Sequence, residues 1–302
     1  MRKNNNLIKL GRFAEAFNFL NQFSEDEIYE IISSVGEEHN IASYSFICFL
    51  ISKNDINLLN GYAISIIYGI MAYLKGAGPL SYSHHLRRLE RDPENIDLIE
   101  YQIMFHECDD DTFRDPEIRT IAENVLLLRP ESEAAQAILR WTSPLSEEPF
   151  TPLGEGLNPY ERVKIFIEKG RFTWAFNEIP KISHDELLTI LRTISSNKDI
   201  TTYGFVWAMI YKKETSELHL VAAKIFMADF CHLNGAAAIV FFHTHRAAEL
   251  EPDNLKIQEQ LLSLYEPDNE SFDLEETKTL VERVLKMNPD SEQGLRVLNL
   301  IG

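Results

Sequence analysis

Two stretches of the chain read almost alike: Gly11-Arg12-Phe13-Ala14-Glu15-Ala16-Phe17-Asn18 and Gly170-Arg171-Phe172-Thr173-Trp174-Ala175-Phe176-Asn177. They lie 159 residues apart, and the same offset relates further identical residues with no insertion: Ser24 and Ser183, Ile41 and Ile200, Gly76 and Gly235, Pro93 and Pro252, Pro130 and Pro289. Chance does not keep one register over such a distance, so the sequence predicts a tandem duplication of a unit of about 140 residues. We assign the copies to residues 1–143 and 160–302.

Residues 144–159 join the two predicted copies. The segment is rich in proline and glycine: Pro144, Pro149, Pro152, Gly154, Gly156 and Pro159. Proline removes backbone donors and glycine adds conformational freedom, so neither a helix nor a strand is expected to run through it. We interpret it as a surface linker.

The apolar residues recur with the period of a helix. Apolar side chains follow one another at i, i+3, i+4 and i+7 in nearly every segment, whereas no clear period-2 run appears. Ser24 with Glu27, and Ser183 with Glu186, have the spacing of a capping box at a helix start. The sequence therefore predicts an all-α protein, with about seven helices in each copy.

Both copies contain two segments that look like the end of a helical repeat. The first segment runs over 86–95 and 245–254, and the second runs over 125–132 and 284–291. These segments resemble the tetratricopeptide repeat, in which a helix closes on A-x-E-L-x-P-x-N and an antiparallel helix follows. The resemblance covers the C-terminal third of each copy and implies an α-solenoid of helical repeats there.

A wider resemblance rests on the run from Cys231-His232-Leu233-Asn234-Gly235-Ala236 through His243 to Pro252. It is similar to duplicated helical proteins of Gram-positive bacteria associated with immunity to polymorphic toxins. That resemblance implies a cytoplasmic protein that binds and blocks a cognate toxin. In the first copy Tyr73 stands where the second has His232.

The composition excludes some classes of partner. The chain has 302 residues and a net charge of -18, with no dense run of Lys and Arg. Such a surface disfavours nucleic acid and acidic lipid and favours a basic protein or peptide, although the charge is also explained by solubility alone. The cysteines Cys48, Cys108 and Cys231 form no CxxC pair, and the opening residues lack a signal-peptide core, so we expect a cytoplasmic protein.

The stretch 58–74 is apolar, uncharged and nearly long enough to span a membrane. The corresponding stretch 217–233 carries Glu217, Lys224 and Asp229. Two copies of one unit are expected in the same solvent, so we predict a buried helix and no membrane partner.

His84 and His243 form the one histidine pair kept at the 159-residue offset. Their segments also keep three further pairs: Gly76 and Gly235, Arg87 and Arg246, Glu90 and Glu249. The paired histidines, arginines and glutamates are either structural or candidates to line a groove. We expect these histidines to be buried and hydrogen-bonded, because buried polar groups normally find partners. The alternative is a general base or a metal ligand.

No catalytic motif supports that alternative. The chain has no HExxH, no paired Cys/His spacing, no P-loop, no dinucleotide fingerprint and no G-x-S-x-G. We therefore expect no catalytic residue, no metal, no cofactor and no enzymatic activity.

Acidic residues crowd two corresponding segments, 107–117 and 266–276. The candidate partner-binding residues there are Asp109, Asp110, Asp111, Asp115, Asp268, Glu270 and Asp273. Neither segment has the central glycine of a calcium loop. They are either solvated loops that carry a buried Phe113 and Phe272, or an acidic rim that meets a basic partner.

Three functions remain open. The first is a non-enzymatic protein-binding scaffold, in particular a cytoplasmic immunity protein. The second is a peptide-responsive regulator of the tetratricopeptide type, with Asn18, Asn177, Tyr44 and Tyr203 gripping a peptide. The third is an enzyme with its site near His84 or His243.

Overall fold

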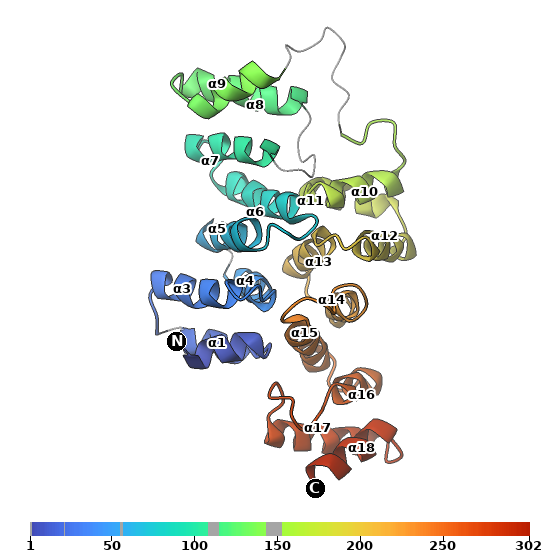
Figure 1. The fold of residues 1–302 in the computed structure, drawn as a ribbon. Helices are drawn as coiled ribbons and strands as arrows, with labels where there is room; N and C mark the ends of the chain where they lie inside the picture. Colours follow the sequence, from blue (N-terminus) through green and yellow to red (C-terminus); the bar gives the residue numbers. More distant parts are fainter. Residues whose placement is uncertain (1, 21, 55–56, 108–114, 143–152) are drawn as a thin grey trace. The chain divides into compact units, whose positions relative to one another are not determined.

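The structure, a computed structural model, describes residues 2–20, 22–54, 57–107, 115–142 and 153–302. These residues form eighteen α-helices, three short π- or 3-10 helical segments and no strand (Figure 1). The predicted all-α class is confirmed for them. The candidates Asp109, Asp110 and Asp111 lie outside the described residues.

The chain divides into two compact units. We call residues 1–52 with 209–302 the terminal unit, and residues 53–208 the central unit. Each unit therefore combines the beginning of one predicted copy with the end of the other. The copies 1–143 and 160–302 describe how the sequence recurs, and they do not coincide with the units that pack together.

The terminal unit contains both ends of the chain. Its N-terminal helices are α1 (Arg2–Lys9), α2 (Phe13–Leu20), α3 (Glu25–Gly36) and α4 (Ala42–Lys53), the last of which ends at the boundary. Its C-terminal helices are α14 (Ser216–Ala228), α15 (Ala236–Leu250), α16 (Leu255–Ser263), α17 (Leu274–Met287) and α18 (Glu292–Ile301). Each helix from α14 to α18 contacts the next one along the chain (orange to red in Figure 1).

The central unit follows a similar plan. It opens with α5 (Asn57–Ile64), the π-helix η1 (Ser65–Ile70), α6 (Ala77–Arg91), α7 (Ile96–Tyr101), the 3-10 helix η2 (Gln102–Glu107), α8 (Asp115–Leu128) and α9 (Glu133–Trp141). It continues with α10 (Pro159–Glu168), α11 (Phe172–Glu178), η3 (Ile179–Lys181), α12 (His184–Ser196) and α13 (Thr201–Lys212), and the boundary falls inside α13. Each helix from α5 to α9 again contacts the next.

The sequence predicted about seven helices per copy, but the described residues of each copy form nine α-helices. The extra helices are short, and backbone geometry separates them. Gly11 and Gly170 have φ angles of 74° and 67°, which end the first helix of each copy before the next begins. Periodicity alone does not detect such a break.

Helix ends follow the capping chemistry expected from the sequence. Ser24 and Ser183 accept from the backbone N–H of Glu27 and Glu186, and each Glu side chain accepts from the serine backbone N–H, so both predicted capping boxes are confirmed. The apolar stretch 58–74 is divided between α5 and η1. In the described part of the chain, no helix is both long and apolar enough to cross a bilayer.

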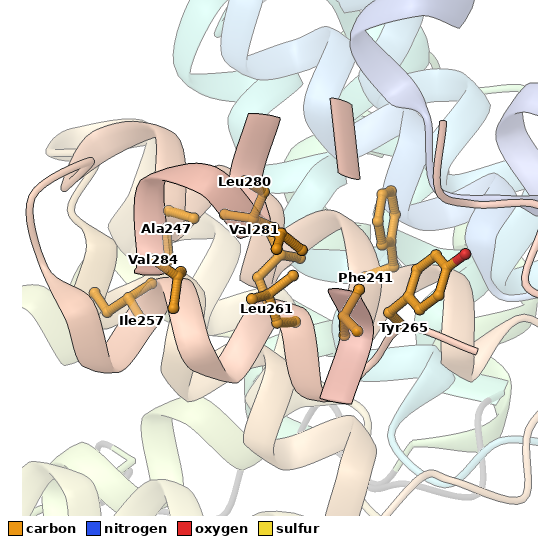
Figure 2. Packing of buried hydrophobic residues seen from close by; sticks show 11 residues of the cluster. Phe241, Ala247, Ile257, Leu261, Tyr265, Leu280, Val281 and Val284 are labelled. Atoms are coloured by element: carbon orange, nitrogen blue, oxygen red, sulfur yellow. The ribbon is translucent and has the colours of Figure 1, made fainter. Parts of the chain in front are cut away.

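Each unit has its own apolar core. In the terminal unit, Figure 2 shows Phe241 and Tyr265 at one end of the α15–α17 cluster and Ile257 and Val284 at the other. In the central unit, Tyr82, Ile118 and Val125 belong to the corresponding cluster. In both units these cores lie beside the groove described next.

Candidate binding grooves

A glycine brings the start of one copy against the end of the other within each unit. A Cβ atom on Gly170 would lie 1.9 Å from the carbonyl oxygen of Pro79, in the first turn of α6. A Cβ atom on Gly11 would lie 2.1 Å from the carbonyl oxygen of Ala238, in the first turn of α15. Both glycines also have positive φ angles. Glycine is therefore required for this approach, and it places the following arginine beside α6 or α15.

In the central unit that arginine is Arg171, which is only 5% exposed. Its Nη1 donates to the Tyr82 hydroxyl at 3.1 Å, and its Nη2 donates to the Glu117 carboxylate. The guanidinium carbon lies 4.8 Å from the centre of the Tyr82 ring and 5.2 Å from that of the Trp174 ring. A buried cation needs such an anion and such ring faces to offset its lost hydration. Burial raises the pKa of Tyr82, so its hydroxyl stays protonated.

A groove of about 670 Å³ opens beside this arginine, between α6, η2, α8 and α11. Apolar side chains form much of its lining: Tyr82, Leu86, Leu89, Ile121 and Trp174. Glu90 and Glu117 add carboxylates, and the Thr173 hydroxyl donates to Glu90 at 2.8 Å. Its volume is in the range of sites that bind small ligands, and its lining combines apolar surface with charged and polar groups.

The terminal unit has a groove of about 460 Å³ at the corresponding place. Eight of its thirteen lining residues lie 159 positions after lining residues of the central groove: Phe241, His245, Ala248, Glu249, Leu261, Glu276, Thr279 and Leu280. Arg12, which corresponds to Arg171, has its Nη2 atom 3.9 Å from Oε2 of Glu276. The arginine–glutamate arrangement therefore occurs in both units, closely in one and loosely in the other.

The histidine pair lies on the same helices as the grooves but is buried. His84 is 4% exposed and His243 is 0% exposed, as predicted. Nδ1 of His84 lies 2.9 Å from Oδ1 of Asn60, so this nitrogen donates to the amide oxygen. Burial, with a smaller effect of Arg87, lowers the pKa of His84 to about 3, so it is neutral at physiological pH.

His243 has a different partner, His219, where the other copy has Asn60. Their Nδ1 atoms lie 2.7 Å apart, and Nε2 of His219 donates to Glu214 at 3.1 Å. A neutral His219 that donates from Nε2 accepts at Nδ1, so His243 donates to it. Burial lowers the pKa of both histidines, and for His243 the neighbouring His219 adds to the effect.

This pair connects to the rim of the terminal groove. Arg246 donates to Glu214 from Nε at 2.8 Å and from Nη2 at 2.9 Å, and to the groove residue Glu249 from Nη1 at 2.9 Å. The bond from Arg246, followed by that from His219, holds the pKa of Glu214 far below its ordinary value. A hydrogen-bonded chain thus runs from the buried histidines to a groove carboxylate.

The acidic candidates differ in exposure and in the contacts that they make. Asp268 and Glu270 are exposed, whereas Asp273 caps α17 by accepting from the backbone N–H groups of Glu275 and Glu276 at 2.9 and 3.1 Å. Asp115 begins α8, but its side chain lies outside the described part. Phe272 packs against Phe241 and Tyr265, with ring centres 4.9 and 5.3 Å apart, while Phe113 is not described.

Of the candidate groove residues, Glu90 and Glu249 line the grooves. Glu117 and Glu276 end the predicted acidic segments but were not singled out, and Arg171 and Arg12 were not predicted as site residues. The signal was present, since Gly-Arg-Phe is identical in both copies. It indicated duplication, but its arginine contacts a residue far away in sequence, which periodicity does not reveal.

Tyr44 and Tyr203, expected to grip a peptide, are fully buried at 0% exposure, because their helices form the interior of each unit. Asn18 and Asn177 are exposed.

Among the described residues, no cluster of three or more His, Cys, Asp or Glu side chains is placed to hold a metal ion. Neither a model of a known protein family, nor a curated protein, nor a solved structure matches this chain.

Proposed function

We propose that this chain is a non-enzymatic, cytoplasmic protein-binding scaffold built from two tandem copies of one helical unit. The observation that carries the proposal is the presence of a groove at corresponding positions of both units. The succession of contacting helices α5–α9 and α14–α18 supports a tetratricopeptide-like stack in each unit. Stacks of this kind recognise proteins and peptides on such surfaces.

Within this proposal, the chain neutralises a toxin as an immunity protein. The net charge of -18 favours a partner with a basic contact surface, because opposite charge speeds association and fixes orientation. The acidic segments 107–117 and 266–276 belong to this surface in the proposal. Exposed Asp268 and Glu270 are available for such a role, whereas Asp273 already caps a helix.

A peptide-responsive regulator is the second candidate. The volumes of the two grooves favour it, since both suit a short peptide segment. The burial of Tyr44 and Tyr203 moves the proposed peptide site from those residues to the grooves. An enzyme site at His84 or His243 is disfavoured, because substrate would have to reach side chains that are 4% and 0% exposed.

The test uses a side chain that fills a groove without touching the core. Thr120 is exposed on α8 and lines the central groove, so Thr120→Trp would block it. Thr189 is equally exposed on α12 of the same unit and does not line the groove, so Thr189→Trp is the matched control. The immobilised full chain captures partners from its native cell, and each captured protein is then purified and titrated.

A partner that binds the wild type and Thr189→Trp, but binds Thr120→Trp at least about tenfold more weakly, supports the proposal. A secreted toxin among such partners selects the immunity role. A partner protein that binds all three chains equally contradicts a role for the central groove. If no protein is captured and the chain instead turns over a small molecule, the scaffold proposal is wrong.

A further inference from the structure

We propose that each unit binds one short peptide segment that presents a basic side chain next to an apolar one, so that one chain holds two segments of the same chemical class. This inference rests on the proposed function and specifies its ligand. It follows from what the two grooves share and from how they differ.

Three polar positions of the linings are the same in both grooves. Two carboxylates and a threonine line the central groove at Glu90, Glu117 and Thr120, and identical residue types line the terminal groove at Glu249, Glu276 and Thr279. The arginine that faces the second carboxylate is also the same, Arg171 or Arg12. Because both grooves keep these carboxylates and this arginine at corresponding places, they favour the same ligand charge there.

The charge of each lining is negative. In the central groove Arg171 offsets Glu117, and Glu90 remains at the exposed rim with one bond from a neutral hydroxyl. A carboxylate accepts several hydrogen bonds at once, so Glu90 has capacity for an incoming ammonium or guanidinium group. This complementarity favours a cationic ligand over an anionic one.

The terminal groove has more charges but the same balance. Three carboxylates line it, those of Glu249, Glu275 and Glu276, and each has a cation nearby: Arg246 at 2.9 Å, Lys278 at 2.7 Å and Arg12 at 3.9 Å. Arg246 is shared with Glu214 and Arg12 with Glu15, so carboxylates still outnumber cations around this groove when the lining Arg283 is included. Glu276 is 62% exposed, and its distance of 3.9 Å from Arg12 is too long for a hydrogen bond. Its carboxylate therefore stays accessible to a ligand cation. Both grooves therefore favour a basic group at their rims.

The apolar lining explains the second half of the ligand. Trp174 is 43% exposed beside Leu86 and Leu89, and covering such surface is the main favourable term in binding. Where the central groove has Leu86 and Leu89, the terminal groove has His245 and Ala248. The apolar side chain that fits best therefore differs between the units, whereas the basic one does not.

The experiment titrates the full chain with capped decapeptides of three kinds. The first set carries Leu or Phe beside Lys or Arg, the second replaces each basic residue by Glu, and the third replaces each apolar residue by Ser. Isothermal calorimetry gives affinity and stoichiometry. We expect the first set to bind at least about tenfold more tightly than either of the others, with two sites per chain.

Variants assign the sites. Thr120→Trp is expected to remove one site and Thr279→Trp the other, while Thr189→Trp keeps both. Equal binding of the acidic and basic sets, a single site in the wild type, or two sites surviving in both groove variants would each overturn the inference. The proposed function has its own test, the capture of a partner protein, and it is rejected if no partner is captured. If a captured partner protein binds through the central groove but none of the decapeptides binds, the peptide inference is wrong and the proposed function stands.

Discussion

The same three residues, Gly-Arg-Phe, give two different ion pairs in the two units. In the central unit Arg171 is 5% exposed and is held by Glu117 and the Tyr82 hydroxyl. In the terminal unit Arg12 is 18% exposed, bonds to Glu15 in the helix that follows it, and lies 3.9 Å from Glu276. The position of the backbone is thus shared, whereas the partner of the side chain is not.

Two substitutions account for this difference. Phe241 stands where the central unit has Tyr82, so Arg12 has no hydroxyl to donate to at that position. Glu15 stands where the central unit has Trp174, so a carboxylate three residues along the helix replaces a ring face. A buried cation needs several partners at once, and the loss of one favours a more exposed, local pair.

The largest expected effect concerns the glycine that both units share. Gly170→Ala puts a Cβ atom 1.9 Å from the Pro79 carbonyl oxygen and also requires a residue other than glycine at a φ of 67°. Gly156 has a similar φ of 78° but no atom within 4 Å of its Cβ position. We expect Gly170→Ala to lower the free energy of unfolding by about 2 kcal/mol more than Gly156→Ala, measured by urea titration.

Both variants place alanine at a positive φ, so the difference between them measures the steric clash of a Cβ atom at position 170 with the Pro79 carbonyl oxygen. Equal losses in the two variants would mean that the start of α11 does not pack against α6 as described.

The next effect separates the two arginines. Arg171→Met leaves Glu117, whose side chain is 24% exposed, without its cation and removes a donor to Tyr82, so we expect a loss of about 2 kcal/mol in the free energy of unfolding. Arg12→Met breaks a more exposed pair, and a loss below about 1 kcal/mol is expected. Urea titration of both variants measures the contrast. A larger loss from Arg12→Met would contradict the assignment of the tighter pair to the central unit.

The third effect depends on pH and compares the two histidine sites. Burial lowers the pKa of His84 to about 3 and of His85 to about 4, and lowers the pKa of His219 and His243 as well. The unfolded chain binds protons on these residues below about pH 6.5 while the folded chain does not. Stability is therefore fully present above that pH and falls as the pH is lowered towards 4.

His219→Asn recreates the pairing of Asn60 with His84 and removes one of these groups. Between pH 6 and 5 we expect the free energy of unfolding to change less steeply than in the wild type, by up to about 1.4 kcal/mol per pH unit. Urea titrations across this range measure the slope. His232→Asn, at an exposed histidine of the same unit, is the matched control for replacing a histidine by asparagine. An unchanged slope in His219→Asn would show that His219 is protonated in the folded chain.

The sequence was sufficient for features that depend on neighbouring residues. Helical periodicity predicted the all-α class, and the serine–glutamate spacing predicted the capping boxes that the structure contains. Burial of His84 and His243 was also predictable, since each lies on a helix with apolar neighbours. The grooves were not predictable, because Arg171 meets Glu117 across 54 residues and Arg12 meets Glu276 across a still longer separation. Only the packing of distant segments determines those contacts.

The smallest expected effect tests where the two copies behave alike. Ser24 and Ser183 cap α3 and α12 with the same geometry, accepting from the backbone N–H of the glutamate three residues on at 3.4 and 3.2 Å. Alanine at either position removes the hydroxyl that accepts from that backbone N–H. Ser24→Ala and Ser183→Ala should therefore each lower the free energy of unfolding by about 1 kcal/mol. The measurement is urea titration of the two variants beside Ser196→Ala, at an exposed serine near the end of α12 that caps no helix start and should cost less. Losses that differ by more than about 1 kcal/mol between Ser24→Ala and Ser183→Ala would contradict the equivalence, because the serine, the glutamate and both bonds of the capping box are the same. Equal losses here, together with unequal losses for the two arginines, would show that the units share their local helix chemistry and differ in the contacts made between distant segments.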